Sequence, residues 1–334
     1  MNGNNKLTGL LHHTTRAYEL HGDRVIEFAS RYGIIIAFLV LCGVLSFSSP
    51  YFLSVGNIAN VLQQTAINGI LAIGMTFAIL TRGIDLSVGS VAACSAMVAA
   101  SFASGSDAWP IYVAISVSLA VGGTLGAFNG LMIARFAIPP FVMTLGMLSM
   151  ARGLTYIYSD GMPISNLSDN YAFIGDGVVL GIPMPVILFF GVFGLAWAGL
   201  RLTTYGRYIY AVGGNPKAAE TSGVRVKLII FSVYVVSGAC AALGGLLLSA
   251  RTSAALPQAA VTYELDAIAA VVIGGTSLAG GVGSVVGTLF GALIMGTINN
   301  GLDLLGVSSF YQQVVKGAII IFAVMLDRSR HSRT

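Results

Sequence analysis

The feature that most constrains this chain is a series of long segments without a charged residue. No Asp, Glu, Lys or Arg occurs from Gly33 to Thr81, and another uncharged segment covers residues 267–302. A membrane-spanning helix needs about 20 mainly apolar residues, so the first segment is long enough for two spans. Only 9% of the residues are charged, whereas a soluble domain has about 25%. The sequence therefore predicts an all-α polytopic membrane protein.

Breaks rich in Gly, Pro, Ser and Asn divide the chain into about ten predicted transmembrane helices. The eighth is expected to be short, because GGTSLAGGVGS at 274–284 interrupts the second uncharged segment. Residues 159–182 have the composition of a loop. The spans are expected near 33–49, 57–80 and 86–104, from Pro110 to Arg135, near 138–158, 184–200 and 228–250, twice within 267–302, and at 310–326.

The distribution of basic residues predicts the orientation of the chain, because cytoplasmic loops carry an excess of Lys and Arg. These residues concentrate in the N-terminal arm 1–32, in the segment 202–227 and in the tail 327–334. Both termini are therefore expected in the cytoplasm, with the transmembrane domain at 33–326 and the loop 159–182 outside. Because topology explains the net charge of +4, we do not expect nucleic-acid binding.

Glycine spacing predicts close contacts between helices, since small residues four apart let two helix backbones approach each other in a membrane. One such row lies on the fourth span and a second lies on the ninth. The rows are Gly122, Gly126 and Gly130, and Gly283, Gly287 and Gly291.

The sequence contains no pattern typical of an enzyme or of a metal site. All four histidines lie in the polar termini, and no H-E-x-x-H motif occurs. No Lys follows a Gly, so the phosphate-binding G-x-x-x-x-G-K-[ST] loop is absent. The three cysteines lie in apolar segments without metal-ligand spacing. We therefore expect no catalytic residue, metal or cofactor, and we assign any ATP hydrolysis to another subunit.

Few ionisable residues lie in or near the predicted spans. Asp85 precedes the third span, where it either caps the helix or belongs to a gate or substrate pathway. Arg152 and Lys316 are expected to extend their charged groups toward the membrane surface. With Asp266 as the only other candidate, the chain offers little from which to build a proton relay.

The long polar segment 202–227 contains signals for one short helix. Asn215 is a favourable N-cap, Pro216 suits the first helical position, and Gly223 suits the residue that ends a helix. The predicted helix, Pro216 to Ser222, is too short to be stable alone. It is therefore expected to lie against its own protein or a partner, and the alternative is an ordinary loop.

Several motifs carry a family resemblance. Ala218-Ala219 followed by Gly223 resembles the E-A-A-x-x-x-G signature of binding-protein-dependent ABC importers. Longer stretches from about residue 35 to 326 are similar to the ribose-type monosaccharide permease family. They are QQTAINGILAIGMTFAILTRGIDLSVGS at 63–90, GRYIYAVGGN at 206–215, YELDAIAAVVIGGTSLAGG at 263–281 and NNGLDLLGVSS at 299–309.

The resemblance implies a permease of a bacterial inner membrane that carries a monosaccharide and has no enzymatic activity. It implies a permease homodimer, a cytoplasmic ABC ATPase and an extracytoplasmic sugar-binding protein as partners. The signature's Glu position holds Lys217, so no acidic contact is carried over. The residues expected to couple to the ATPase are Pro216, Ala218, Ala219 and Gly223.

Four amides on the second span form a candidate substrate pathway, together with Asp85. Their spacing of three, four and four residues places them along one helical face, which is expected to turn inward. They either line a path for hydroxyl-rich sugars or hydrogen-bond to neighbouring helices. The amides are Asn57, Asn60, Gln64 and Asn68.

Two other functions remain open at this point. A branched-chain amino-acid importer permease would share the architecture but carry a zwitterionic substrate. An ion-coupled secondary carrier would need no ATPase.

Overall fold

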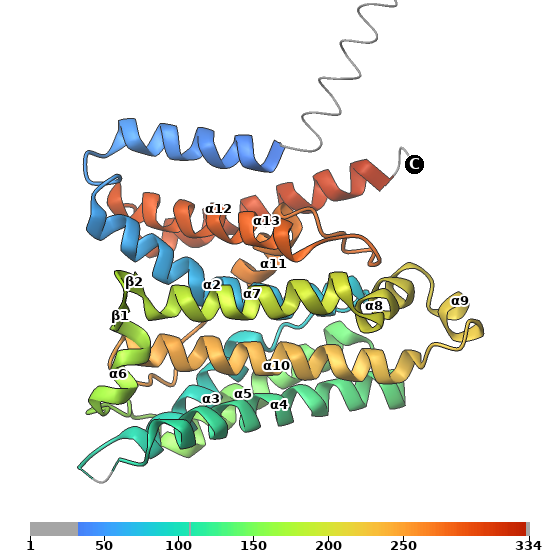
Figure 1. Ribbon diagram of the computed structural model, residues 1–334, viewed down its shortest axis with the longest axis horizontal. Helices are drawn as coiled ribbons and strands as arrows, with labels where there is room; N and C mark the ends of the chain where they lie inside the picture. Colours follow the sequence, from blue (N-terminus) through green and yellow to red (C-terminus); the bar gives the residue numbers. More distant parts are fainter. Residues whose placement is uncertain (1–32, 107, 332–334) are drawn as a thin grey trace, which may run out of the picture.

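The structure is a computed structural model that describes residues 33–106 and 108–331. Its helices run roughly parallel to one long direction, and they form a single bundle (Figure 1). The long helices are Gly33–Ser48, α2 (Val55–Leu80), α3 (Val88–Ala103), α4 (Ile111–Phe136), α5 (Pro140–Ser159), α7 (Met184–Leu202), α10 (Val226–Arg251), α12 (Val285–Leu304) and α13 (Ser309–His331). The shorter ones are α6 (Asp169–Asp176), α8 (Thr204–Gly214), α9 (Pro216–Thr221) and α11 (Tyr263–Ile273).

This architecture confirms the all-α polytopic prediction. Each of the ten predicted spans corresponds to a helix. Among the described helices, five are long and apolar enough to cross a membrane: α2, α4, α7, α10 and α12. The predicted arm 1–32 lies outside the described residues.

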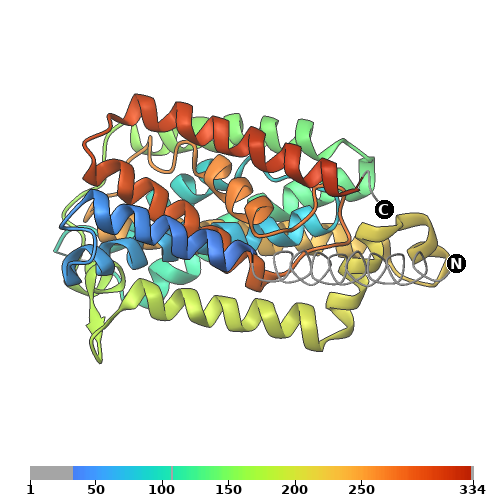
Figure 2. The ribbon, with the colours of Figure 1, turned by 90° about the horizontal axis from the view of Figure 1, so that it is seen from above.

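The two ends of the bundle differ. Helices α8 and α9 lie at one end, which we call the α9 end, and the chain's last helix α13 also finishes there (Figures 1 and 2). Helix α6 and a small hairpin lie at the other end, which we call the hairpin end. The hairpin pairs β1 (Val178–Val179) with β2 (Ile182–Pro183) in antiparallel register.

The centre of the bundle is formed by α2 and α3. Every residue of α2 from Thr65 to Leu80 is buried, and α3 is buried along most of its length. Helix α2 packs against α7, α10, α11 and α12, whereas α3 packs against α4, α5 and α10. Because α3 consists largely of Ala, Ser, Gly and Val, these neighbours can approach it closely.

The predicted glycine row on the fourth span is confirmed as a helix contact. A Cβ atom added to Gly126 would lie 3.1 Å from the Cα of Gly238 on α10, and one added to Gly130 would lie 2.6 Å from the carbonyl oxygen of Phe231. In the second row, Gly287 and Gly291 lie against α11. Gly283 precedes α12 and is not part of a helical row, because the helix begins only at Val285.

Two connections are more structured than their composition predicts. Within 159–182 the chain forms α6 and the hairpin, because Tyr171 and Ile174 are buried against the bundle. The hydroxyl of Tyr171 hydrogen-bonds to that of Ser249 on α10 at 2.7 Å. At the C-terminal end, α13 continues to His331, so the predicted boundary between span and tail at residue 327 does not coincide with the end of the helix.

The eighth span is short, as predicted. Helix α11 has 11 residues and is therefore about 16 Å long, roughly half the thickness of a bilayer's hydrocarbon core. It ends at Ile273, with Gly274 as its C-cap, and the following loop continues to the α9 end. There the amide of Gly281 donates a hydrogen bond to the carbonyl oxygen of Leu80 at 2.9 Å. At this position the chain crosses the bundle as a half-length helix followed by a glycine-rich loop.

Candidate functional site

Helix α9 has the local structure that its sequence predicts. The side-chain oxygen of Asn215 accepts a hydrogen bond from the amide of Ala218 at 3.1 Å, and Pro216 is the first helical residue. Gly223 adopts a left-handed conformation with φ of +85° just after the helix. The helix itself ends at Thr221, one residue before the predicted end.

The two alanines of α9 differ in their exposure to solvent. Ala219 is buried against the protein, as is Val224 just after the helix. Lys217, Ala218 and Glu220 are exposed. One side of this short helix is therefore attached to the bundle and the other is free to meet a partner.

The segment 202–227 also contains α8, which the sequence analysis missed. Thr203 caps α8 by accepting a hydrogen bond from the amide of Gly206 at 3.3 Å, and Ile209 and Val212 are fully buried. The threonine followed by apolar residues at helical spacing is the signal that predicts this helix. Gly213 lies in the last turn of α8 and does not interrupt the helix.

The end of α8 meets two other segments in a contact that we call the glycine junction. It consists of the turn 80–82 after α2, residues 210–214 of α8 and the loop 280–283. Arg82 donates from Nε to the carbonyl oxygen of Gly213 at 2.6 Å, and its guanidinium also hydrogen-bonds to the carbonyl oxygen of Gly214. The hydroxyl of Tyr210 donates to the carbonyl oxygen of Gly283 at 3.0 Å.

Glycine is required in this junction because the backbones touch. A Cβ atom on Gly281, whose φ is +75°, would lie 2.7 Å from the amide nitrogen of Gly214. The polar segment that carries α9 is thus connected directly to α2 and to the loop that follows α11.

The four amides of α2 have different surroundings. Asn57 is buried and exchanges two hydrogen bonds with Asn300 on α12, at 2.7 and 3.0 Å. Asn68 is also buried, Gln64 is partly buried, and Asn60 is exposed on the single chain. Within the single chain, Asn57 and Asn68 are therefore turned inward and Gln64 partly so, whereas Asn60 faces outward. The reason is that α2 is enclosed continuously only from Thr65 to Leu80, whereas nearer its start only single positions such as Asn57, beside α12, are covered.

Asp85 organises the turn between α2 and α3, but it is not the N-cap residue of α3. Its carboxylate accepts hydrogen bonds from the amide and hydroxyl of Ser87, at 3.1 and 2.6 Å, and from the hydroxyl of Ser237 on α10 at 2.7 Å. Ser87 is the N-cap residue and also accepts from Asn129 on α4 at 3.0 Å. This fully enclosed network holds α3, α4 and α10 together at the α9 end.

The two cations expected to extend to the membrane surface instead have partners inside the protein. Lys316 on α13 forms an ion pair with Asp266 on α11 at 2.8 Å, and the Asp266 side chain is only 1% exposed. Arg152 donates to the carbonyl oxygens of Pro257 and Ala259, at 2.6 and 2.9 Å. Asp266 compensates the charge of Lys316, and backbone carbonyl oxygens accept hydrogen bonds from Arg152. Sequence spacing alone does not reveal either partner. Within the described residues, no group of side chains could hold a metal ion.

Comparisons with known proteins agree with the motifs found in the sequence. The profile of a family described as branched-chain amino acid transport system / permease component matches residues 57–324. The ribose import permease protein RbsC of Haemophilus influenzae is 49% identical over 296 residues, which cover 87% of this chain and 91% of the relative. No solved structure matches the chain.

Two further relatives are named for other sugars. The D-allose transport system permease protein of Escherichia coli is 41% identical and covers 90% of this chain and 92% of its own length. The galactose/methyl galactoside import permease protein of Escherichia coli is 38% identical, with 94% and 98% covered. This chain therefore belongs to the permease family that the profile describes, and within it to the ribose-type monosaccharide ABC importer permeases.

Proposed function

We propose that this chain is the membrane permease of an ABC importer that carries a monosaccharide, ribose or a similar pentose or hexose. The observation that carries the proposal is its similarity, along about nine tenths of its length, to permeases named for ribose, allose and galactose. The partners proposed from the family resemblance are a separate ATPase, an extracytoplasmic sugar-binding protein and a second copy of the permease.

The exposed side of α9 is the proposed contact with the ATPase. Ala218 lies on this side, whereas Ala219 attaches the helix to the bundle. Pro216 and Gly223 act by setting where the helix starts and ends. The glycine junction supports this role, because a displacement of α8 and α9 would reach α2 through the hydrogen bonds of Arg82.

Part of the amide face of α2 is the proposed sugar pathway. Asn57 is engaged by Asn300, so we assign it to helix packing. Gln64 and Asn68 do not form such a pair with another amide. Asn60 is exposed on the single chain, so a second copy of the permease could complete the path beside it. Amides suit this purpose because they offer both hydrogen-bond donors and acceptors to sugar hydroxyls. Asp85 contributes by holding the turn at the end of α2.

Reconstitution tests the transport proposal. The permease is incorporated into liposomes with its ATPase and binding protein, and uptake of labelled ribose, allose, galactose and leucine is measured. We expect ATP-dependent uptake of a monosaccharide and only when all components are present. Leucine uptake without sugar uptake would indicate an amino-acid importer. Uptake by the lone chain driven by an ion gradient would indicate a secondary carrier.

Cysteine labelling tests the proposed orientation, in which the α9 end and both termini face the cytoplasm. Ser222→Cys and Ser165→Cys are made separately in a variant without the native cysteines. A membrane-impermeant thiol reagent should label the Ser165→Cys variant in intact cells, and the Ser222→Cys variant only after the membrane is opened. The reverse pattern would invert the topology.

A further inference from the structure

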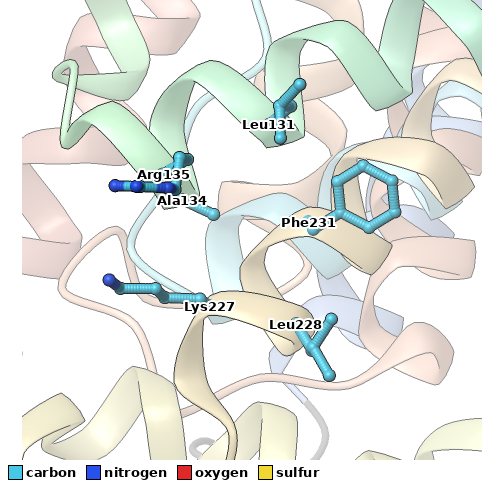
Figure 3. Close-up of a pocket in the computed structure, with 6 residues that line it drawn as sticks. All are labelled: Leu131, Ala134, Arg135, Lys227, Leu228 and Phe231. Carbon is cyan, nitrogen blue, oxygen red and sulfur yellow. The ribbon is translucent and has the colours of Figure 1, made fainter.

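A groove on the side of the bundle, at its α9 end, lies between α4 and α10. It has a volume of about 300 Å³. Four apolar side chains form its walls, and two cations stand at its edge (Figure 3). The lining residues are Leu131, Ala134, Arg135, Lys227, Leu228 and Phe231.

The groove begins where the glycine contact between the two helices ends. The backbones touch at Gly130 and Phe231, but beyond this point α4 has no further glycine before it ends. The small side chain of Ala134 leaves the groove open. Leu131 and Leu228 are 46% and 54% exposed, so the apolar walls face outward from the single chain.

The two cations lie where each helix meets the α9 end. Arg135 is in the last turn of α4 and Lys227 is in the first turn of α10. Both side chains are exposed, and their charged groups extend to the same side of the groove (Figure 3). Neither forms a salt bridge, since the one found among the described residues joins Lys316 to Asp266. The groove therefore combines an apolar wall with uncompensated positive charge.

We propose that this groove binds an anionic phospholipid. One acyl chain would lie against Leu131, Leu228 and Phe231, and the headgroup phosphate would lie between Arg135 and Lys227. Basic residues beside a membrane attract anionic headgroups, and basic pockets between transmembrane helices can bind them specifically. A second copy of the chain fits less well, because a twofold contact through the groove would bring like charges together.

The site is placed to affect the segment that carries α9. Lys227 lies in the first turn of α10, a few residues after Gly223. A phospholipid held by Lys227 and by Arg135 on α4 would therefore restrain the connection from α9 to the bundle. The binding itself does not depend on the transported substrate, so its test remains separate from that of the transport proposal.

Native mass spectrometry of the purified permease tests the binding. Phosphatidylglycerol is titrated against phosphatidylcholine with the same acyl chains. Each cation near an anionic surface contributes about fivefold in affinity, so Arg135→Gln with Lys227→Gln should weaken phosphatidylglycerol binding about 25-fold. Phosphatidylcholine binding should change little. The matched control is Arg201→Gln, which removes an exposed cation at the same end, on α7, and should leave both affinities unchanged.

A second variant tests the apolar wall without altering the charge. Ala134→Trp should fill the groove and weaken phosphatidylglycerol binding, while sn-glycerol 3-phosphate, which lacks acyl chains, should bind weakly in all forms. Equal affinity for the two phospholipids would overturn the proposal. So would an unchanged phosphatidylglycerol affinity in the cation and tryptophan variants, or efficient disulfide cross-linking of Leu131→Cys between two copies of the chain.

Discussion

Arg82 is the side chain through which the structure joins α2 to α8, and its replacement gives the sharpest test of coupling. Arg82→Gln removes the charged donor that bonds to the carbonyl oxygens of Gly213 and Gly214. A hydrogen bond from a charged group contributes about 1.5–3 kcal/mol. Because one of these two bonds is exposed, we take about 2 kcal/mol for both. The attachment of α8 to α2 should then open about 30 times more often.

The expected result is a permease that still binds its ATPase but moves less sugar. The exposed side of α9 is unchanged, so co-purification with the ATPase should persist, whereas ATP-dependent uptake should fall several-fold. Hydrogen exchange should show faster exchange of the α8 and α9 amides, with Arg207→Gln on exposed α8 surface as the matched control. Unchanged exchange and unchanged uptake in Arg82→Gln would refute the role of the glycine junction.

Three further predictions follow from particular contacts. Gly223→Val should lower uptake while membrane insertion persists. Nothing lies within 4 Å of an added Cβ, so the penalty of about 1 kcal/mol or more comes from the φ of +85° alone. Unchanged uptake would show that α9 has no role in coupling. Gln64→Leu should alter sugar uptake or preference with normal assembly, whereas Gln63→Leu should not; loss of thermal stability with Gln64→Leu would instead indicate helix packing. Lys316→Met should destabilise the permease by about 3–5 kcal/mol, because it leaves Asp266 buried without its charged partner. In a thermal unfolding assay in detergent, adding Asp266→Asn should restore part of the lost stability. Equal stability of the wild type and Lys316→Met would contradict this role.

Several features of the fold follow from the sequence because their causes are local. An apolar segment of about 20 residues suffices to define a span, whatever lies beside it. The N-cap of α9 involves Asn215 and Ala218, which are three residues apart. The turn that follows this helix depends on the backbone freedom of Gly223 alone. The glycine row at Gly122, Gly126 and Gly130 predicts a close contact for the same reason, although it does not name α10 as the partner.

Features of the candidate site that depend on a distant partner were decided by the tertiary structure. Asn57 could have lined a pathway, but α12 places Asn300 beside it. The sequence predicts the charged group of Lys316 at the membrane surface. In the structure, α11 places Asp266 2.8 Å from it. Spacing along one helix determines which side chains share a face, whereas the partner of each face depends on which helices pack together. A buried polar group lowers its free energy by pairing, and the partner that satisfies it is selected by that packing.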